Sequence, residues 1–527
     1  MPDRKKQELP PSDAPARRLT DGRRGTSETL SRDVASRRTV AFVSTALFSA
    51  AAHGFLFTNE FFSHDSVSYF AYADWGFQFY AGVGRFFIPV YEALKGGVAA
   101  PWLIGLLFTV WMSLAGIVVT DLLDIRSPSG VALSCGLLCT NVSLTLTGAT
   151  YVYCMDEYAL ALLCAAAAAF LFLRGRRSAP LGLLPLLVSL SVYQPYATVT
   201  AALCLLALIR QASEGRRVAA IFSRGVASLF MLGAAFVGYN ALWTLVRLLL
   251  NVPQTRDVVP LREFGIKERV LSANSVFFGF LFRPGVVLGI LRPLAHGLLL
   301  ALLIWRLLLI LTNGRVPAAN RILALALSAL LPVTLYSVAL LMPGEAHDLT
   351  AYARELFYLL PLSLSDAAPA ARTPRRSADA ERAAVCVLLA LLLWHHVVYA
   401  NQAYMKKDLE KNSTLILAVR IIDRIESVPG YVSNKTPVTF VGRLDANEPL
   451  DVPRKALADF QTQTGLWHSH SATYNFGRYL TDYLQYPLRW EQETNVTRTE
   501  LAKSMPIFPA SGSVRMIDGV VVVKLSE

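Results

Sequence analysis

Apolar runs long enough to cross a lipid bilayer recur along most of this chain, and they limit the fold more than any other feature. A spanning helix needs about 20 apolar residues. The 527 residues are 54% hydrophobic and only 17% charged, and the mean hydropathy is +0.42. A soluble domain cannot bury that much apolar surface. The sequence therefore predicts an α-helical polytopic membrane protein.

About eleven runs are candidates for the membrane spans, several of them short enough to be tilted or broken. They are residues 39–58, 101–123, 130–149, 158–173, 181–193, 196–209, 226–250, 285–311, 322–342, 353–364 and 384–401. Arg and Lys gather before the first run and in alternate connections, as in "LRGRRS" and "ARTPRRSADAER". Because cytoplasmic loops retain positive charge, we expect a cytoplasmic N-terminus and an outer location for the chain after about residue 402. The net charge of +12 has the same explanation, so we expect no nucleic-acid partner.

The two ends of the chain differ from its apolar middle. Residues 1–38 are polar and rich in Arg, Asp, Ser and Pro, which is typical of a disordered tail, here cytoplasmic. Residues 39–402 are expected to form the transmembrane domain. Residues 403–527 combine a helical pattern in "YMKKDLEKNSTLILAVRIIDRIES" with strand patterns in "TPVTFVGRL" and "VRMIDGVVVVKL", which predicts a small extracytoplasmic α/β domain.

Carboxylates occur in two of the connections expected on the outer side. His64 and Asp65 follow the first span in "FFSHDSVSYF", and Asp156 and Glu157 begin the fourth in "TYVYCMDEYAL". Ionisable groups near membrane depth are costly to keep, so each is a candidate site residue. The structural alternatives stay open, because Asp65 after Ser63 is also typical of a helix cap and first-turn acids compensate a helix dipole.

Other polar and aromatic residues lie on the same expected side. Arg85 stands in "GVGRFF", and Tyr193, Gln194 and Tyr196 form a corner between two apolar runs in "LSVYQPYATV". Arg85 could equally extend to the interface along its apolar stem, and the tyrosine corner could serve as an interfacial anchor.

Together these residues suit a sugar that is carried on a lipid phosphate. A carboxylate can take the proton from an acceptor hydroxyl as that oxygen attacks the anomeric carbon. Arg or Lys can stabilise the departing phosphate, and aromatic faces are suited to sugar rings and to the headgroup region.

The order of "HDSVSY", "GVGRFF", "YVYCMDEYALALL" and "SLSVYQPYATV", followed by Arg354 after "MPGEAH", resembles the GtrII family of polytopic bacterial glucosyltransferases. The resemblance runs from about residue 40 to the end of the chain. It implies a GT-C type membrane fold. It also implies that a polyprenyl-phosphate-linked sugar, typically undecaprenyl-phosphate glucose, is used on the outer side of the inner membrane to decorate O-antigen or a similar surface polysaccharide.

The resemblance also suggests roles for single residues. Asp65 falls at the first-loop acid and becomes the candidate catalytic base, while Asp156 and Glu157 match the second-loop acidic position. Arg85, Gln194 and Arg354 match polar positions, with donor or phosphate contacts implied.

One departure from the family pattern bears on metal binding. Similar proteins often carry two adjacent acids in the first loop, whereas here His64 precedes Asp65. His64 is therefore a replacement partner or a neutral spacer. No cofactor is assigned, and the need for a divalent metal stays open.

Three other functions are compatible with the composition. A GT-C transferase of another sugar or acceptor, such as lipid A or a protein, would carry the same motifs. A flippase or transporter of lipid-linked sugars would place polar residues near the bilayer midplane in repeated or broken helices, and the acids here lie at the outer ends instead. A scaffold for envelope assembly would leave those acids unexplained.

Overall fold

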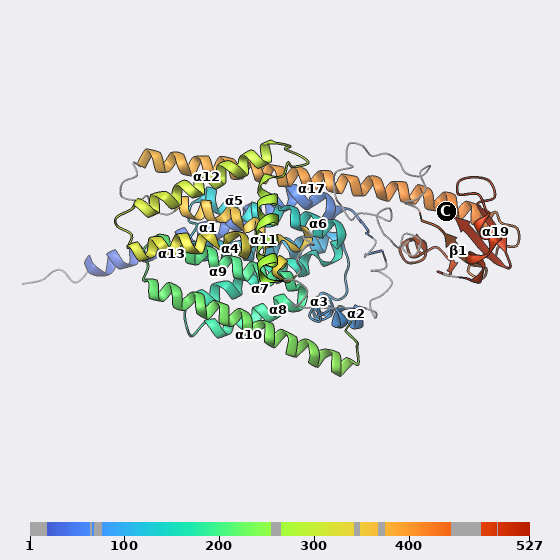
Figure 1. The fold of residues 1–527 in the computed structure, drawn as a ribbon, viewed down its shortest axis with the longest axis horizontal. Coiled ribbons are helices and arrows are strands. Elements are labelled where there is room, and N and C mark those ends of the chain that lie inside the picture. Colours follow the sequence, from blue (N-terminus) through green and yellow to red (C-terminus); the bar gives the residue numbers. More distant parts are fainter. Residues whose placement is uncertain are drawn as a thin grey trace, which may run out of the picture.

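Helices make up most of the protein (Figure 1). The computed structural model describes residues 18–63, 66–67, 76–254, 265–341, 348–366, 375–443, 476–492 and 494–527, so His64 and Asp65 lie outside the described residues. The longer helices are α1 (Arg18–Thr58), α4 (Pro101–Leu122), α5 (Pro128–Thr140), α7 (Met155–Arg174), α9 (Ala197–Ser213), α10 (Val218–Leu250), α11 (Ile266–Phe282), α12 (Leu291–Thr312), α13 (Ala318–Ala329) and α17 (Arg375–Glu426).

Short helices and single turns connect these long elements. The short α-helices are α2 (Gly76–Gly82), α3 (Ile88–Lys95), α6 (Val142–Thr150), α8 (Leu183–Val192), α14 (Leu331–Leu335), α15 (Val338–Leu341), α16 (Leu359–Asp366) and α19 (Glu500–Lys503). The tighter or wider turns are η2 (Val152–Cys154), η3 (Ala179–Gly182), η4 (Gln194–Tyr196), η5 (Asp348–Thr350), η6 (Tyr352–Tyr358), η11 (Tyr479–Tyr483) and η12 (Asn495–Arg498).

Eight helical segments in the described part of the chain are long and apolar enough to cross a membrane. They are Val34–Thr58, Pro101–Leu122, Pro128–Thr150, Val152–Arg174, Gln194–Ser213, Val218–Leu250, Leu291–Thr312 and Arg376–Glu426. The prediction of a polytopic membrane protein is confirmed, whereas the count of about eleven spans is not.

The three remaining apolar runs form shorter pieces of helix. Residues 181–193 lie in the apolar helix Ala179–Val192, and residues 322–342 are divided among α13, α14 and α15. The division falls at Pro332, which stands in the first turn of α14 and cannot donate the backbone hydrogen bond that a continuous helix needs. Residues 353–364 form η6 and α16.

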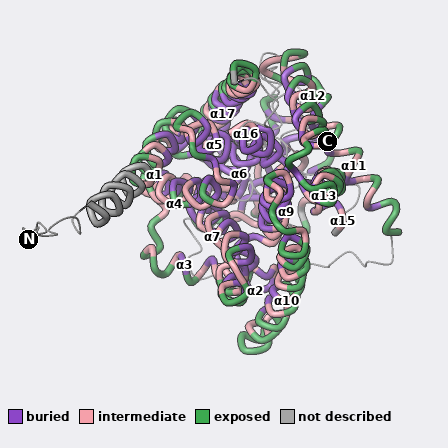
Figure 2. Tube along the Cα trace, turned by 90° about the vertical axis from the view of Figure 1, so that its left-hand side faces the viewer, coloured by how far each residue is buried: buried purple, intermediate pink, exposed green. Residues whose placement is uncertain are grey.

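Burial divides the bundle into a centre and a rim. Figure 2 shows α5, α6, α7, α9 and α16 buried in the middle, with exposed surface along α10 and α12. Of the 18 most apolar consecutive residues in Pro128–Thr150, 83% are buried, whereas in Val218–Leu250 only 17% are. The second segment therefore offers its surface to lipid. Small residues explain the close packing at the centre, since a Cβ at Gly136 would lie 2.8 Å from Phe48 and 2.9 Å from Leu393.

α1 begins at Arg18, inside the stretch 1–38 for which a disordered tail is expected, while residues 1–17 lie outside the described range. From residue 26 to residue 53 the sequence contains neither Gly nor Pro. Helix propagation costs little once the apolar part has nucleated, so the polar stretch continues the spanning helix.

α17 joins the bundle to the C-terminal domain as one unbroken helix of 52 residues. At 1.5 Å per residue it is about 78 Å long, well over twice the thickness of a bilayer core. Figure 1 shows it leaving the bundle and ending beside the sheet. There Leu417, Ala418, Ile421 and Ile425 enter the core of the domain. The boundary expected between residues 402 and 403 therefore falls within a helix.

The four described strands of the domain form one sheet in the order β2-β1-β4-β3. They are β1 (Pro437–Val441), β2 (Arg489–Trp490), β3 (Val514–Ile517) and β4 (Val520–Lys524). β1 runs parallel to β2 and to β4, and β3 and β4 form an antiparallel hairpin. Asp518 and Gly519 turn the hairpin with φ of 48° and 78°, the pair of left-handed residues that a two-residue hairpin turn requires. The strands predicted near both positions are confirmed.

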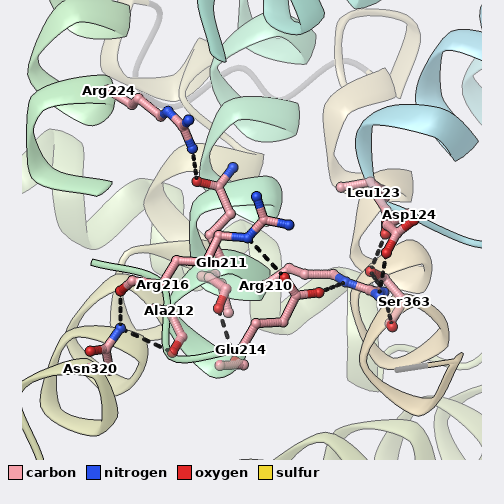
Figure 3. Close-up of polar contacts among 12 residues, drawn as sticks. Leu123, Asp124, Arg210, Gln211, Ala212, Glu214, Arg216, Arg224, Asn320 and Ser363 are labelled. Atoms are coloured by element: carbon pink, nitrogen blue, oxygen red, sulfur yellow. Dashed lines mark hydrogen bonds and ion pairs between the residues drawn. The ribbon is translucent and has the colours of Figure 1, made fainter. Parts of the chain in front are cut away.

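The bundle has two polar ends. We call the end next to the C-terminal domain the domain end, and the opposite one, where Arg382 near the start of α17 pairs with Asp366 at 3.3 Å, the far end. Figure 3 shows the polar network at the far end, where Arg210 of α9 contacts Asp124 after α4 and Ser363 of α16. Asn320 of α13 donates to the carbonyl oxygen of Arg216. The far end is thus tied together by ion pairs and carbonyl contacts.

Candidate active site at the domain end

Asp156 is held by two donors from the short helix α3. It lies in the first turn of α7 and is fully buried. Its carboxylate accepts a hydrogen bond from the Tyr91 hydroxyl at 3.0 Å and lies 3.3 Å from Lys95 Nζ through each oxygen. Trp111 of α4 donates in turn to the Tyr91 hydroxyl at 3.0 Å. The loop after α1 and the fourth predicted span therefore meet at this carboxylate.

Glu157 has no comparable set of donors. Its side chain is fully buried, Lys95 Nζ is 4.0 Å from one oxygen, and neither oxygen accepts a hydrogen bond from a described residue. Lys95 also pairs with Glu92 at 2.8 Å, so one ammonium faces three carboxylates. Burial alone would lower the pKa of Lys95, but Asp156 and Glu157 outweigh it and hold the pKa above its ordinary value. Lys95 stays charged, and a single ammonium serves three carboxyl groups, an arrangement that burial makes costly.

Arg85 lies next to these acids, on a group of tyrosines. Its guanidinium donates to the hydroxyl of Tyr158, the residue after Glu157, at 3.3 Å and lies 5.2 Å from the ring centroid of Tyr193. Arg85 Nε is buried without an acceptor among the described residues. The rings of Tyr193 and Tyr196 are 4.9 Å apart, and the buried Tyr196 hydroxyl likewise has no partner there.

Gln194 holds the loop that carries Arg85. Its side-chain nitrogen donates to the carbonyl of Val83 at 3.1 Å and to the Tyr239 hydroxyl at 2.8 Å. That hydroxyl donates to the carbonyl of Gly84 at 3.0 Å. Gly84 has a φ of 80°, and a Cβ at this position would overlap the Tyr239 hydroxyl, so only glycine suits this turn. The contacts give Gln194 a positioning role toward Arg85.

Arg354 lies in a second polar cluster, carried by η5 and η6. It is buried, pairs with Asp348 at 2.6 Å and with Glu355 at 3.4 Å, and its guanidinium lies 4.7 Å from the ring centroid of Phe280. Burial raises the pKa of Glu355, although Arg354 opposes the shift. Glu355 is 3.9 Å from the ring nitrogen of His396.

The motif-based prediction missed part of this second cluster. His395 and His396 are buried, and the Nδ1 atoms of both have no hydrogen-bond partner in the described part of the chain. Arg292 of α12 shares the Phe280 ring with Arg354, at 5.3 Å from its centroid. The signal was present in "LLLWHHVVYA", where two ionisable residues interrupt an apolar run, a costly arrangement at membrane depth.

Aromatic contacts join the two clusters. The ring of Tyr196 lies 5.8 Å from that of Tyr352, two residues before Arg354, and 6.3 Å from that of Tyr158. The structure thus brings together the described site residues predicted from the sequence, which are Arg85, Asp156, Glu157, Tyr193, Gln194, Tyr196 and Arg354.

His64 and Asp65 are outside the described residues, and their predicted roles stay predictions. The residues flanking them are defined, since Ser63 and Ser66 bond to each other through their hydroxyls at 3.1 Å and Ser63 donates to the carbonyl of Thr150 at 2.6 Å. Within the described ranges no group of three or more His, Cys, Asp or Glu side chains could hold a metal ion.

Fold and site together define a polytopic membrane protein with a buried acidic and aromatic site at one end of its helices. The family of the Glucosyl transferase GtrII has a sequence model that matches residues 54–362, more than half of the 527 residues. The chain belongs to this glucosyltransferase family, and the resemblance noted from its motifs is confirmed. No curated protein and no solved structure matches it.

Proposed function

We propose that the protein transfers a sugar, specifically glucose, from a polyprenyl-phosphate donor to O-antigen or a similar surface polysaccharide. In this proposal the reaction takes place at the domain end of the bundle, on the periplasmic side of a bacterial inner membrane. The N-terminus is then cytoplasmic and the C-terminal domain periplasmic, as the distribution of Arg and Lys predicts. Membership of the glucosyltransferase family supports the reaction class.

The observation that carries the proposal is the excess of buried carboxylate beside Arg85 and the tyrosines. A buried carboxylate without donors is costly, so its retention favours a binding partner such as a substrate hydroxyl. Asp156 has its donors in Tyr91 and Lys95, which suits orientation and charge. Neither oxygen of Glu157 accepts a hydrogen bond from a described N–H or O–H group, which suits contact with an acceptor hydroxyl.

In the proposed step a carboxylate removes the proton of an acceptor hydroxyl. The hydroxyl oxygen then forms a bond to the anomeric carbon, and the bond from that carbon to the phosphate oxygen breaks, so that the lipid phosphate leaves with the electron pair. Asp65 remains the proposed base by family resemblance, with Asp156 and Glu157 as the second acidic group. His64 would assist Asp65 or separate it from its neighbours.

Cations near the site would stabilise the charge on the departing phosphate. Arg85 has a buried Nε without a described acceptor, and the single positive charge of Arg354 is shared between Asp348 and Glu355. We assign both to the donor phosphate. Tyr193 and Tyr196 would stack on the sugar ring.

The test is the composition and linkage of surface polysaccharide in cells that carry the wild-type gene, Asp65→Asn, Glu157→Gln, or a deletion. Loss of one sugar branch in the deletion and in either point variant supports the transferase and identifies the sugar. Glu500→Gln, at a side chain that is 90% exposed, is the matched control and should keep the branch. A branch that is lost on deletion but kept in both point variants would favour a flippase.

A further inference from the structure

Residues 61–63 lie where two hydrophobic cores meet. Phe61 is fully buried in the core of the helical bundle. Phe62, the next residue, is 5% exposed and belongs to the core of the C-terminal domain, as does Val67. Two adjacent residues of a single short stretch therefore contribute to different cores.

On the domain side, Phe62 is enclosed by two tyrosines and a lysine. Its ring centroid lies 4.8 Å from that of Tyr479 and 4.8 Å from that of Tyr483, and the two tyrosines stack at 5.4 Å. The buried Lys407 of α17 donates to the carbonyl of Phe62 at 2.8 Å. Aromatic contacts of this kind stabilise beyond the burial of apolar area, so ring packing and a hydrogen bond together hold the segment.

On the bundle side, the same segment holds the turn that precedes the acidic site. Ser63 donates to the carbonyl of Thr150, the last residue of α6, at 2.6 Å. Tyr153 of η2 donates to the carbonyl of Phe61 at 3.2 Å. η2 is one short turn and leads directly into α7, where Asp156 and Glu157 begin. Its position therefore depends on contacts from outside the helix.

We propose that the C-terminal domain positions the Asp156 and Glu157 carboxylates, acting through Phe62. This inference rests on the proposed function of those carboxylates. Phe62 is a positioning residue and touches neither carboxylate. The domain fixes Phe62, the hydroxyl of Ser63 and the carbonyl of Phe61 hold Thr150 and Tyr153, and these fix the start of α7.

The first test compares Phe62→Ala with Phe440→Ala in the full-length protein. Phe440 is buried in the same domain core and packs on Phe476 at 5.4 Å, so both variants remove a phenyl ring from one core. We expect kcat to fall roughly 10- to 100-fold in Phe62→Ala, as small displacements of catalytic groups do, with KM changed less than about twofold because no substrate contact is lost. Phe440→Ala should keep kcat, and Phe62→Tyr should restore it.

If Phe62→Ala fails to fold, Phe62→Leu keeps the apolar volume and loses the ring contacts. A wild-type kcat in folded Phe62→Ala or in folded Phe62→Leu would overturn the proposal. An equal fall in the Phe440 variant would also overturn it, since the effect would then be general stability of the domain.

The second test measures the coupling between the C-terminal domain and the start of α7, and it needs no sugar transfer. Backbone hydrogen exchange over residues 150–157 should speed up at least about tenfold in Phe62→Ala and stay unchanged in Phe440→Ala, as local opening does when its supporting contacts are lost. Unchanged exchange in Phe62→Ala would overturn the positioning role. If exchange changes as expected in the two variants but the wild-type protein transfers no sugar, the positioning role stands and the proposed function is contradicted.

Discussion

The two ends of the helical bundle differ in how their charged side chains are paired. At the far end, Arg210 meets Glu214 at 2.9 Å and Asp124 at 3.2 Å, and it also donates to the Ser363 hydroxyl at 2.9 Å. Asp366 accepts from two backbone N–H groups and pairs with Arg382. These charges face partners from several helices, as groups that hold an assembly together do.

At the domain end, buried polar atoms lack partners among the described residues. They include both oxygens of Glu157, one oxygen of Glu355, the Nε atom of Arg85 and the Nδ1 atoms of His395 and His396. Such atoms reduce the stability of the folded chain, so they are retained where something other than the fold uses them. At the far end Arg321 Nε also lacks a described partner, so the difference between the ends concerns the carboxylates. Asp124, Glu214 and Asp366 are paired there, whereas Glu157 and Glu355 at the domain end keep oxygens without a described donor, as a binding site does.

The largest effect expected is on transfer by Glu157→Gln. Loss of a catalytic carboxylate should lower the transfer rate about 10²- to 10⁴-fold. The same change replaces a buried carboxyl group whose oxygens accept no hydrogen bond from a described N–H or O–H group, so the temperature of unfolding should stay equal or rise. Transfer assays and thermal unfolding of the purified protein measure both quantities. A variant that loses stability and activity together would contradict the difference between the two ends.

Lys95→Met should destabilise the domain end strongly. It leaves three carboxylates without their ammonium, and removing one partner of a buried pair costs about 3–5 kcal/mol. The pKa of Lys95 is raised in the folded protein, so its contribution is complete below the unfolded pKa of about 10.4 and is lost only as pH rises through the folded value. Denaturant unfolding of both proteins between pH 6 and pH 10 should show a constant difference. A difference below about 1 kcal/mol would mean that the carboxylates are neutral.

Arg210→Met should cost less, about 1.5–3 kcal/mol, and should leave the transfer rate per folded molecule unchanged. Asp124 and Glu214 are 36% and 28% exposed, so water can hydrate them when the guanidinium is gone. The same unfolding experiment measures the loss, with transfer as the second readout. A fall in transfer without unfolding would show that the far end also contributes to the site.

Asp366→Asn should have the smallest effect, about 1 kcal/mol, because it weakens the cap of α5 without removing it. Burial alone would raise the pKa of Asp366, but the backbone N–H groups of Ser127 and Arg126 outweigh it and hold the pKa below its ordinary value. The stabilisation is therefore present above the unfolded pKa of about 3.9 and is lost as pH falls through the folded value. Unfolding free energies of the two proteins should converge in acid. A difference that persists there would exclude the carboxylate charge as its cause.

Much of the fold could be predicted because it depends on local pattern. Eight of the apolar runs form helices of spanning length, and both strand motifs near the C-terminus form strands. The break at Pro332 has a local cause in the proline, and the continuity of α17 across residue 402 accompanies its packing in two separate cores. A count of apolar residues predicts neither.

The candidate site was likewise predictable from the sequence only in part. Asp156, Glu157 and the tyrosine corner stand out in the sequence because polar residues there interrupt apolar runs. Lys95 ends an amphipathic stretch and looks like an ordinary surface lysine, yet it lies 3.3 Å from Asp156, 61 residues further along the chain. Only the fold reveals such a pair.

The length of α17 has a mechanical consequence. A rigid helix of about 78 Å turns a tilt of 5° within the bilayer into a displacement of roughly 7 Å at its end, beside the sheet. Helices tilt when the thickness of the surrounding membrane changes. Such a displacement would move the C-terminal domain relative to the bundle, and it would act on Phe62, which follows α1 and packs into the core of that domain.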